Sequence, residues 1–80
     1  MRIQLIAFGI AKDILKARAM SYDLNEGNTI AALKTALIKA YVGFDKLSSL
    51  AFAVNEEYVH DTHVLQEGDE VVLIPPVSGG

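Results

Sequence analysis

Apolar and polar residues alternate at the start of the chain and predict a β-strand over residues 2–8. Gly9 breaks this alternation. One face of the strand carries Ile3, Leu5 and Ala7, and the other carries Gln4, Ile6 and Phe8. A looser alternation over residues 18–24 predicts a second strand, and residues 12–15 form a short connection with room for a helical turn.

One clear helix is expected in the middle of the chain. Residues 25–28 form a turn cluster, and Thr29 after them is a typical N-cap. Gly43 is expected to end the helix. Its apolar stripe consists of Ile30, Leu33, Leu37 and Ala40 or Tyr41.

The last third of the chain predicts three more strands. Residues 50–54 and 57–59 should form a hairpin around Asn55 and Glu56. Residues 70–74 are rich in β-branched side chains, which indicates a buried, central strand. The order of elements favours an α+β fold, with a mixed sheet, one main helix across it, and the first and last strands as parallel neighbours.

Composition narrows the classes of function. Eighty residues, of which 51% are hydrophobic and 21% charged, describe one small globular domain. A net charge of −3 argues against nucleic acid as a partner, because phosphate binding requires a basic surface. The chain has no cysteine, and therefore no disulfide or thiolate chemistry. Neither a leader nor a run of membrane-spanning length is recognisable, so the expected location is the cytosol, away from membranes.

His60 and His63, with Asp61 between them, are the only residues whose spacing hints at a metal site. A structural or catalytic metal needs at least a third fixed ligand, and the sequence offers no cysteine to supply it. No metal site is therefore expected.

The final six residues are the most specific feature of the chain. Two terminal glycines, Gly79 and Gly80, have no Cβ and can enter a slot too narrow for other side chains. Pro75 and Pro76 fix φ and end the preceding strand, so the segment should leave the domain semi-extended, reaching roughly 20 Å. Two glycines at the end of a segment that two prolines make stiff suggest that the C-terminal carboxylate is itself the reactive group.

Residues spread over the whole chain carry a resemblance to a known family. They are Phe8-Gly9, Lys12-Asp13, Thr29-Ile30, Leu33, Ala53-Val54-Asn55, Leu65, Gly68-Asp69-Glu70-Val71 and Pro75-Pro76-Val77-Ser78-Gly79-Gly80. In these residues the chain resembles the small subunit of molybdopterin synthase, a ubiquitin-like sulfur carrier. That resemblance implies a β-grasp domain over residues 1–74 and an extended tail over residues 75–80.

The resemblance also implies a chemistry for Gly80. An E1-like enzyme would use ATP to adenylate its carboxylate, and a sulfur donor would then replace AMP to leave a thiocarboxylate. The large synthase subunit, in a heterotetramer, would take the tail and pass the sulfur to cyclic pyranopterin monophosphate in molybdenum cofactor biosynthesis. This chain would bind no cofactor itself and would not be catalytic alone.

Each tail residue has a role under this interpretation. Gly79 and Gly80 would pass through the channel of the partner, and Val77 and Ser78 would form backbone hydrogen bonds with it. Pro75 and Pro76 would reduce the entropy lost on insertion.

Docking of the body requires a surface as well. We expect Phe8, Tyr58 and Ile74 to form an apolar patch for the partners, because exposed patches usually mark interaction sites. The alternative for Phe8 and Tyr58 is ordinary packing in the sheet, and for Ile74 it is burial in the core. An acidic cluster, Glu67, Asp69 and Glu70, either steers a basic partner or is a solvated turn.

Three other functions stay open at this point. A sulfur carrier for thiamine or for tRNA thiolation would have the same fold and activation step. A ubiquitin-like modifier would join Gly80 to lysines of other proteins. In a plain interaction domain the tail would be inert.

Overall fold

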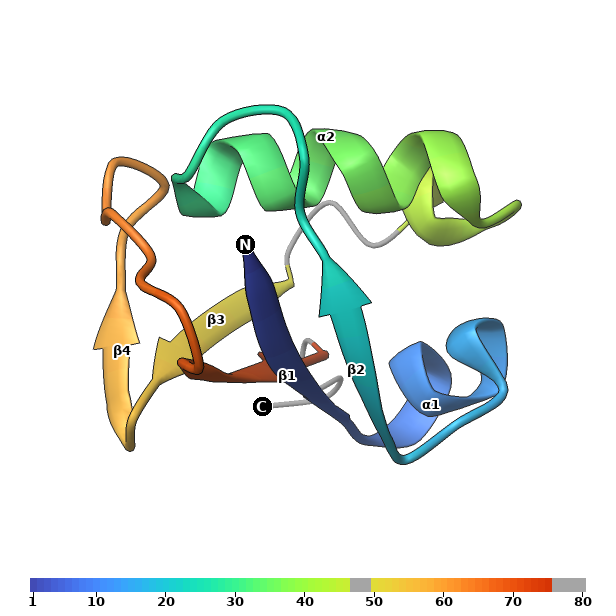
Figure 1. The fold of residues 1–80 in the computed structure, drawn as a ribbon. Coiled ribbons are helices and arrows are strands. Elements are labelled where there is room, and N and C mark those ends of the chain that lie inside the picture. Colours follow the sequence, from blue (N-terminus) through green and yellow to red (C-terminus); the bar gives the residue numbers. More distant parts are fainter. Residues whose placement is uncertain (47–49, 76–80) are drawn as a thin grey trace.

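Most of the residues that the computed structural model describes, 1–46 and 50–75, belong to strands and helices (Figure 1). In chain order, the elements are β1 (Arg2–Ala7), α1 (Gly9–Leu15), β2 (Ala19–Asp23), α2 (Ile30–Ala40), a 3₁₀ turn η1 (Phe44–Lys46), β3 (Ala51–Val54), β4 (Glu57–Val59) and β5 (Glu70–Ile74).

The five strands form one mixed sheet in the order β2-β1-β5-β3-β4. Its central pair, β1 and β5, is parallel, as predicted, and the other pairs are antiparallel. Val71 and Leu73 of β5 are completely buried, which explains the β-branched composition of that strand. Because β5 lies at the centre, the chain after Ile74 leaves from the middle of the sheet.

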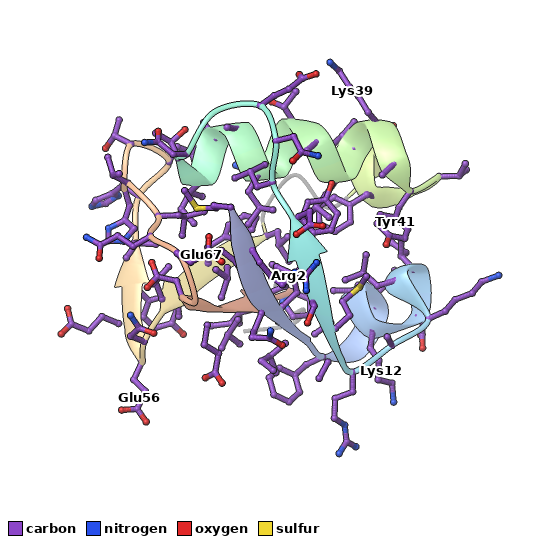
Figure 2. All side chains as sticks on the ribbon, viewed as in Figure 1. Arg2, Lys12, Lys39, Tyr41, Glu56 and Glu67 are labelled. Carbon is purple, nitrogen blue, oxygen red and sulfur yellow. The ribbon has the colours of Figure 1, made fainter. Side chains whose placement is uncertain are left out.

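Helix α2 covers one face of this sheet (Figure 1). Thr29 is its N-cap, as predicted, and the Thr29 Oγ1 accepts a hydrogen bond of 3.1 Å from the Ala32 N–H. On the opposite side of the helix Lys39 points away from the sheet (Figure 2). The core between helix and sheet consists mainly of Ile30, Leu33 and Leu37 of α2, Ile3, Leu5 and Ala7 of β1, Phe52 and Val54 of β3, and Val71 and Leu73 of β5.

A second helix, α1, replaces the short connection that the sequence predicted. Strand β1 ends at Ala7, so Phe8 is not a strand residue but the N-cap of α1. Helix α1 forms because Ala11 and Leu15, four residues apart, both bury their side chains in the core. Lys16 then ends it in the left-handed conformation.

The ends of two other predicted elements also shift. Helix α2 ends at Ala40, and Gly43, at φ +96°, lies in the turn that follows rather than ending the helix. The predicted hairpin between β3 and β4 is confirmed. Asn55 and Glu56 both have positive φ, at 50° and 75°, the pattern of a tight two-residue turn.

Candidate partner-docking surface and the base of the C-terminal segment

The sheet face away from α2, here called the open face, carries a row of small and apolar side chains that crosses all five strands. Alternation along each strand sends these residues away from the core. Strand register places Ile6 opposite both Ala19 and Val72, and Ala53 opposite both Val72 and Tyr58. In spatial order the row is Ala19, Ile6, Val72, Ala53 and Tyr58.

A second apolar group lies one step further along β5. Ile74 is opposite Ala51 of β3. Ala7 of β1 pairs with Leu73 of β5. Phe8 and Ile74 are the next residues of these two segments, so they lie at neighbouring positions at this end of the sheet. The open face is therefore apolar toward the end of β5. We call this part, consisting of the row and of Phe8, Ile74 and Ala51, the apolar half.

The opposite half of the open face is polar. Gln4 lies opposite Glu70, and its Nε2 donates to the Ser21 Oγ at 3.0 Å. Next to them, the Arg2 Nε donates to Asp23 Oδ1 at 3.0 Å. A partner that covers apolar surface would therefore meet the open face at the end from which the C-terminal segment leaves.

The predicted patch residues differ in exposure. Tyr58 is 75% exposed and Phe8 is 50% exposed, so neither is ordinary packing within the sheet. Ile74 is partly buried, between the two alternatives considered for it. Two residues that sequence reasoning did not single out belong with them, since Ile6 and Val72 connect Phe8 and Ile74 to Tyr58.

Pro75, the last residue that the structure describes, packs against the start of α1. A Cβ built on Gly9 would lie 3.2 Å from the Pro75 Cγ, so the proline ring sits over the bare Cα of Gly9. Ile10, which follows Gly9, is a 52% exposed apolar residue that the sequence analysis did not single out. The remaining predicted tail residues, Pro76, Val77, Ser78, Gly79 and Gly80, lie outside the described residues.

Two of the three acidic residues near β5 hold the backbone of the preceding turn. Glu67 Oε1 accepts a hydrogen bond of 3.0 Å from the Arg2 N–H. Asp69 Oδ2 accepts one of 2.9 Å from the Gln66 N–H, and its Oδ1 accepts one of 3.3 Å from Asn55 Nδ2. These contacts give Glu67 and Asp69 a local structural role.

The strongest electrostatic pair of the open face lies in its polar half, where Arg2 meets β2 (Figure 2). The side-chain hydrogen bond from Arg2, and then its positive charge, hold the pKa of Asp23 below the ordinary value of 3.8. On the other face of β2, burial and then Tyr41 raise the pKa of Tyr22.

Among residues 1–46 and 50–75, no group of three His, Cys, Asp or Glu side chains could hold a metal, and Asp61 instead pairs with Lys34 at 3.3 Å. A groove of about 430 Å³ lies between the end of β2 and α2, and contains none of the predicted site residues. In the same part of the chain, no helix is long and apolar enough to cross a membrane.

Comparison with known proteins identifies the family. The sequence profile of the ThiS family matches residues 6–80. The chain belongs to the ThiS family. Among individual relatives, the molybdopterin synthase sulfur carrier subunit of Chlamydomonas reinhardtii is 32% identical to this chain over 83 residues, and the match covers 100% of both chains. The predicted resemblance is thereby confirmed.

Solved structures confirm the fold of this ThiS family member as the ubiquitin-like β-grasp. A putative molybdopterin converting factor subunit 1 from Pyrococcus furiosus superposes with a TM-score of 0.85 at 22% identity, covering 96% of this chain and 99% of that one. A chain from the protein–protein complex of subunits 1 and 2 of the molybdopterin-converting factor of Helicobacter pylori superposes with a TM-score of 0.68 at 26% identity, covering 100% of both.

Proposed function

We propose that this chain is the sulfur carrier subunit of a molybdopterin synthase and that the carboxylate of Gly80 carries the sulfur. The observation that carries the proposal is the match to the carrier subunit of Chlamydomonas reinhardtii over the full length of both chains. The geometry supports it, because the apolar half of the open face leads directly to Pro75 at the base of the C-terminal segment.

The chemistry follows from the properties of a carboxylate. A terminal carboxylate is ionised at neutral pH, since its pKa is about 3.3–3.7, and it does not react with nucleophiles. Adenylation by ATP, with loss of pyrophosphate, makes the carbonyl of Gly80 an acyl donor. A sulfur donor then displaces AMP and leaves a thiocarboxylate. We expect the E1-like partner to bind the ATP and this chain to bind no cofactor.

The large synthase subunit is the partner proposed for the apolar half. The complex of subunits 1 and 2 from Helicobacter pylori, a chain of which matches this one, supports such a partner. Phe8 and Tyr58 would pack against its surface. Residues 75–80 would enter its active site, where the thiocarboxylate gives up its sulfur. Aromatic side chains at the centre of an interface commonly supply much of its binding energy.

Intact-mass spectrometry tests the proposal. The chain is incubated with an adenylating enzyme of the family, ATP and a sulfide source, and then with a large synthase subunit and cyclic pyranopterin monophosphate. A mass gain equal to replacing one oxygen by sulfur, followed by formation of the dithiolene, is the expected result. A chain that never gains sulfur under these conditions contradicts the proposal.

Deletion of Gly80 is the matched control. This variant should gain no sulfur, while its melting temperature stays within about 2 °C of the wild type, because a terminal residue beyond the domain adds little to its stability. A large fall in melting temperature would instead show that Gly80 belongs to the folded body.

The same spectra separate the other candidate functions. A ladder of higher-mass conjugates to other proteins would support a ubiquitin-like modifier. Sulfur gained by the chain but passed only to a thiamine precursor or to tRNA would place it in another branch of sulfur carriers.

A further inference from the structure

The junction between β1 and α1 touches the end of β5 at one point. The parallel pairing of β1 with β5 ends at Ala7 and Leu73. Strand β1 is followed by α1, and β5 continues for one more residue, Ile74, which pairs with Ala51 of β3. Gly9 begins α1 with φ +56°, and Pro75 follows β5. These two residues meet, since a Cβ on Gly9 would lie 3.2 Å from the Pro75 Cγ.

Two separate requirements therefore fall on Gly9. Its φ lies in the left-handed region, which residues with a Cβ adopt at a cost. The space beside it is also occupied, because 3.2 Å is shorter than the favourable separation of about 3.5–4.0 Å between carbon atoms. Any side chain at this position would push the ring of Pro75 outward.

Gly68 has only the first of these requirements. Its φ is +84°, in the same left-handed region, but no atom lies within 4 Å of the place where a Cβ would stand. It belongs to the turn before β5 and is not part of the apolar half. Gly68 therefore offers a control in which the backbone strain of a substitution is present and the contact with proline is absent.

We infer that Gly9 is a positioning residue that sets the direction in which the C-terminal segment leaves the sheet. This inference rests on the proposed function and deepens it. The ring of Pro75 fixes its own φ near −65°, so the place of the ring determines where the following residues start. Gly9 lets the ring lie flat against the domain, beside the Phe8 that the partner is proposed to bind.

Direction at the base matters because the following segment is long. Five residues span up to about 17 Å when extended, so a small tilt at Pro75 moves the far end by much more than the displacement at the ring. A misplacement of about 1 Å at reacting atoms can cost about 100-fold in rate. The contact between Gly9 and Pro75 thus couples docking through Phe8 to delivery through Gly80.

The test compares Gly9→Ala with Gly68→Ala in the thiocarboxylated chain bound to a large synthase subunit. Both substitutions should lower the melting temperature, since both place a Cβ at positive φ, and Gly9→Ala should lower it at least as much because its Cβ also meets Pro75. Only Gly9→Ala should slow single-turnover sulfur transfer to cyclic pyranopterin monophosphate, by about ten-fold or more. Its dissociation constant for the large subunit should stay within about three-fold of the wild type, because Phe8 and Tyr58 are unchanged.

Pro75→Ala completes the test as a double-mutant cycle. Alanine at position 75 lacks the Cγ that a Cβ at position 9 would meet. Adding Gly9→Ala to Pro75→Ala should therefore slow sulfur transfer much less than adding Gly9→Ala to the wild type does. Three results would each overturn the inference: a loss of transfer rate in Gly68→Ala equal to that in Gly9→Ala, a Gly9→Ala variant as fast as the wild type, or a loss caused by Gly9→Ala that is the same with proline and with alanine at position 75.

The result for the wild-type chain distinguishes a failure of this inference from a failure of the proposed function. A wild-type chain that gains and transfers no sulfur contradicts the function itself. A wild-type chain that transfers sulfur, together with a Gly9→Ala variant that does so equally fast, contradicts only the role of Gly9.

Discussion

Replacing Phe8 by glutamate should separate partner binding from folding. Phe8 is the N-cap of α1, makes no side-chain capping bond, and is 50% exposed. Full burial of a phenylalanine side chain stabilises a protein by about 1.5–3 kcal/mol, so the half that is in contact contributes roughly 1 kcal/mol. A loss of that size corresponds to a fall in melting temperature of about 4–8 °C for a domain of this length.

The effect on binding should be larger. An aromatic residue at the centre of an interface commonly contributes at least about 2 kcal/mol, equal to roughly 30-fold in the dissociation constant. Phe8→Glu also places a charge in the apolar half. Isothermal titration calorimetry against a large synthase subunit measures the binding, and differential scanning calorimetry of the free chain measures the stability.

Val42→Glu is the control for this experiment. Val42 is a fully exposed apolar residue that follows α2, on the side of the sheet opposite the open face. Its substitution should change neither the melting temperature nor the dissociation constant appreciably. If Phe8→Glu weakens binding no more than Val42→Glu does, Phe8 is not part of the docking surface. A fall in melting temperature beyond about 15 °C would show that Phe8 is a core residue instead.

Two further substitutions test the fold around the site. Thr29→Ala removes the hydrogen bond from the Ala32 N–H and should lower the free energy of unfolding, measured by thermal denaturation, by about 1 kcal/mol. Thr35→Ala is the control, at an exposed position inside α2. It should be neutral or slightly stabilising, because alanine is the better helix former. Equal losses from both would refute the capping role. Asp23→Asn tests the pair with Arg2: because the folded-state pKa of Asp23 is lowered, its stabilising effect is complete above pH 3.8 and is lost as the pH falls through the lowered pKa. The melting temperatures of wild type and Asp23→Asn should therefore differ at pH 7 in low salt and converge as the pH falls through the lowered pKa of Asp23. A difference that does not shrink on acidification would mean that the carboxylate charge is not its source.

Much of the fold could be predicted from the sequence, because it depends on residues close together in the chain. Alternation of apolar side chains located the strands, helical spacing located α2, and Thr29 marked where α2 begins. Helix α1 was missed because its buried positions, Ala11 and Leu15, are too few to establish a helical period in seven residues. The prediction that Phe8 belongs to the first strand was wrong for the same reason. Strand β1 ends at Ala7, and Phe8 is the N-cap of the helix that was missed.

The prolines and glycines of residues 75–80 form a local motif from which the sequence predicts a reactive C-terminus, and that chemistry stays a prediction. Phe8 and Tyr58 were correctly placed on the surface. That Ile6 and Val72 lie between them could not be predicted from the sequence. Alternation predicts which face of the sheet a residue lies on, but not which residues of other strands lie beside it. The row exists only through the register of five strands.

The sequence by itself thus determined the strands, helix α2 and the central place of the β-branched strand β5, all of which follow from local periodicity and backbone preference. Only the tertiary structure decided that the apolar half of the open face lies at the end of β5, and that Gly9 lies beneath Pro75. The physical reason is that both features depend on contacts between residues from opposite ends of the chain. Such contacts are set by strand pairing and core packing, which no local pattern specifies.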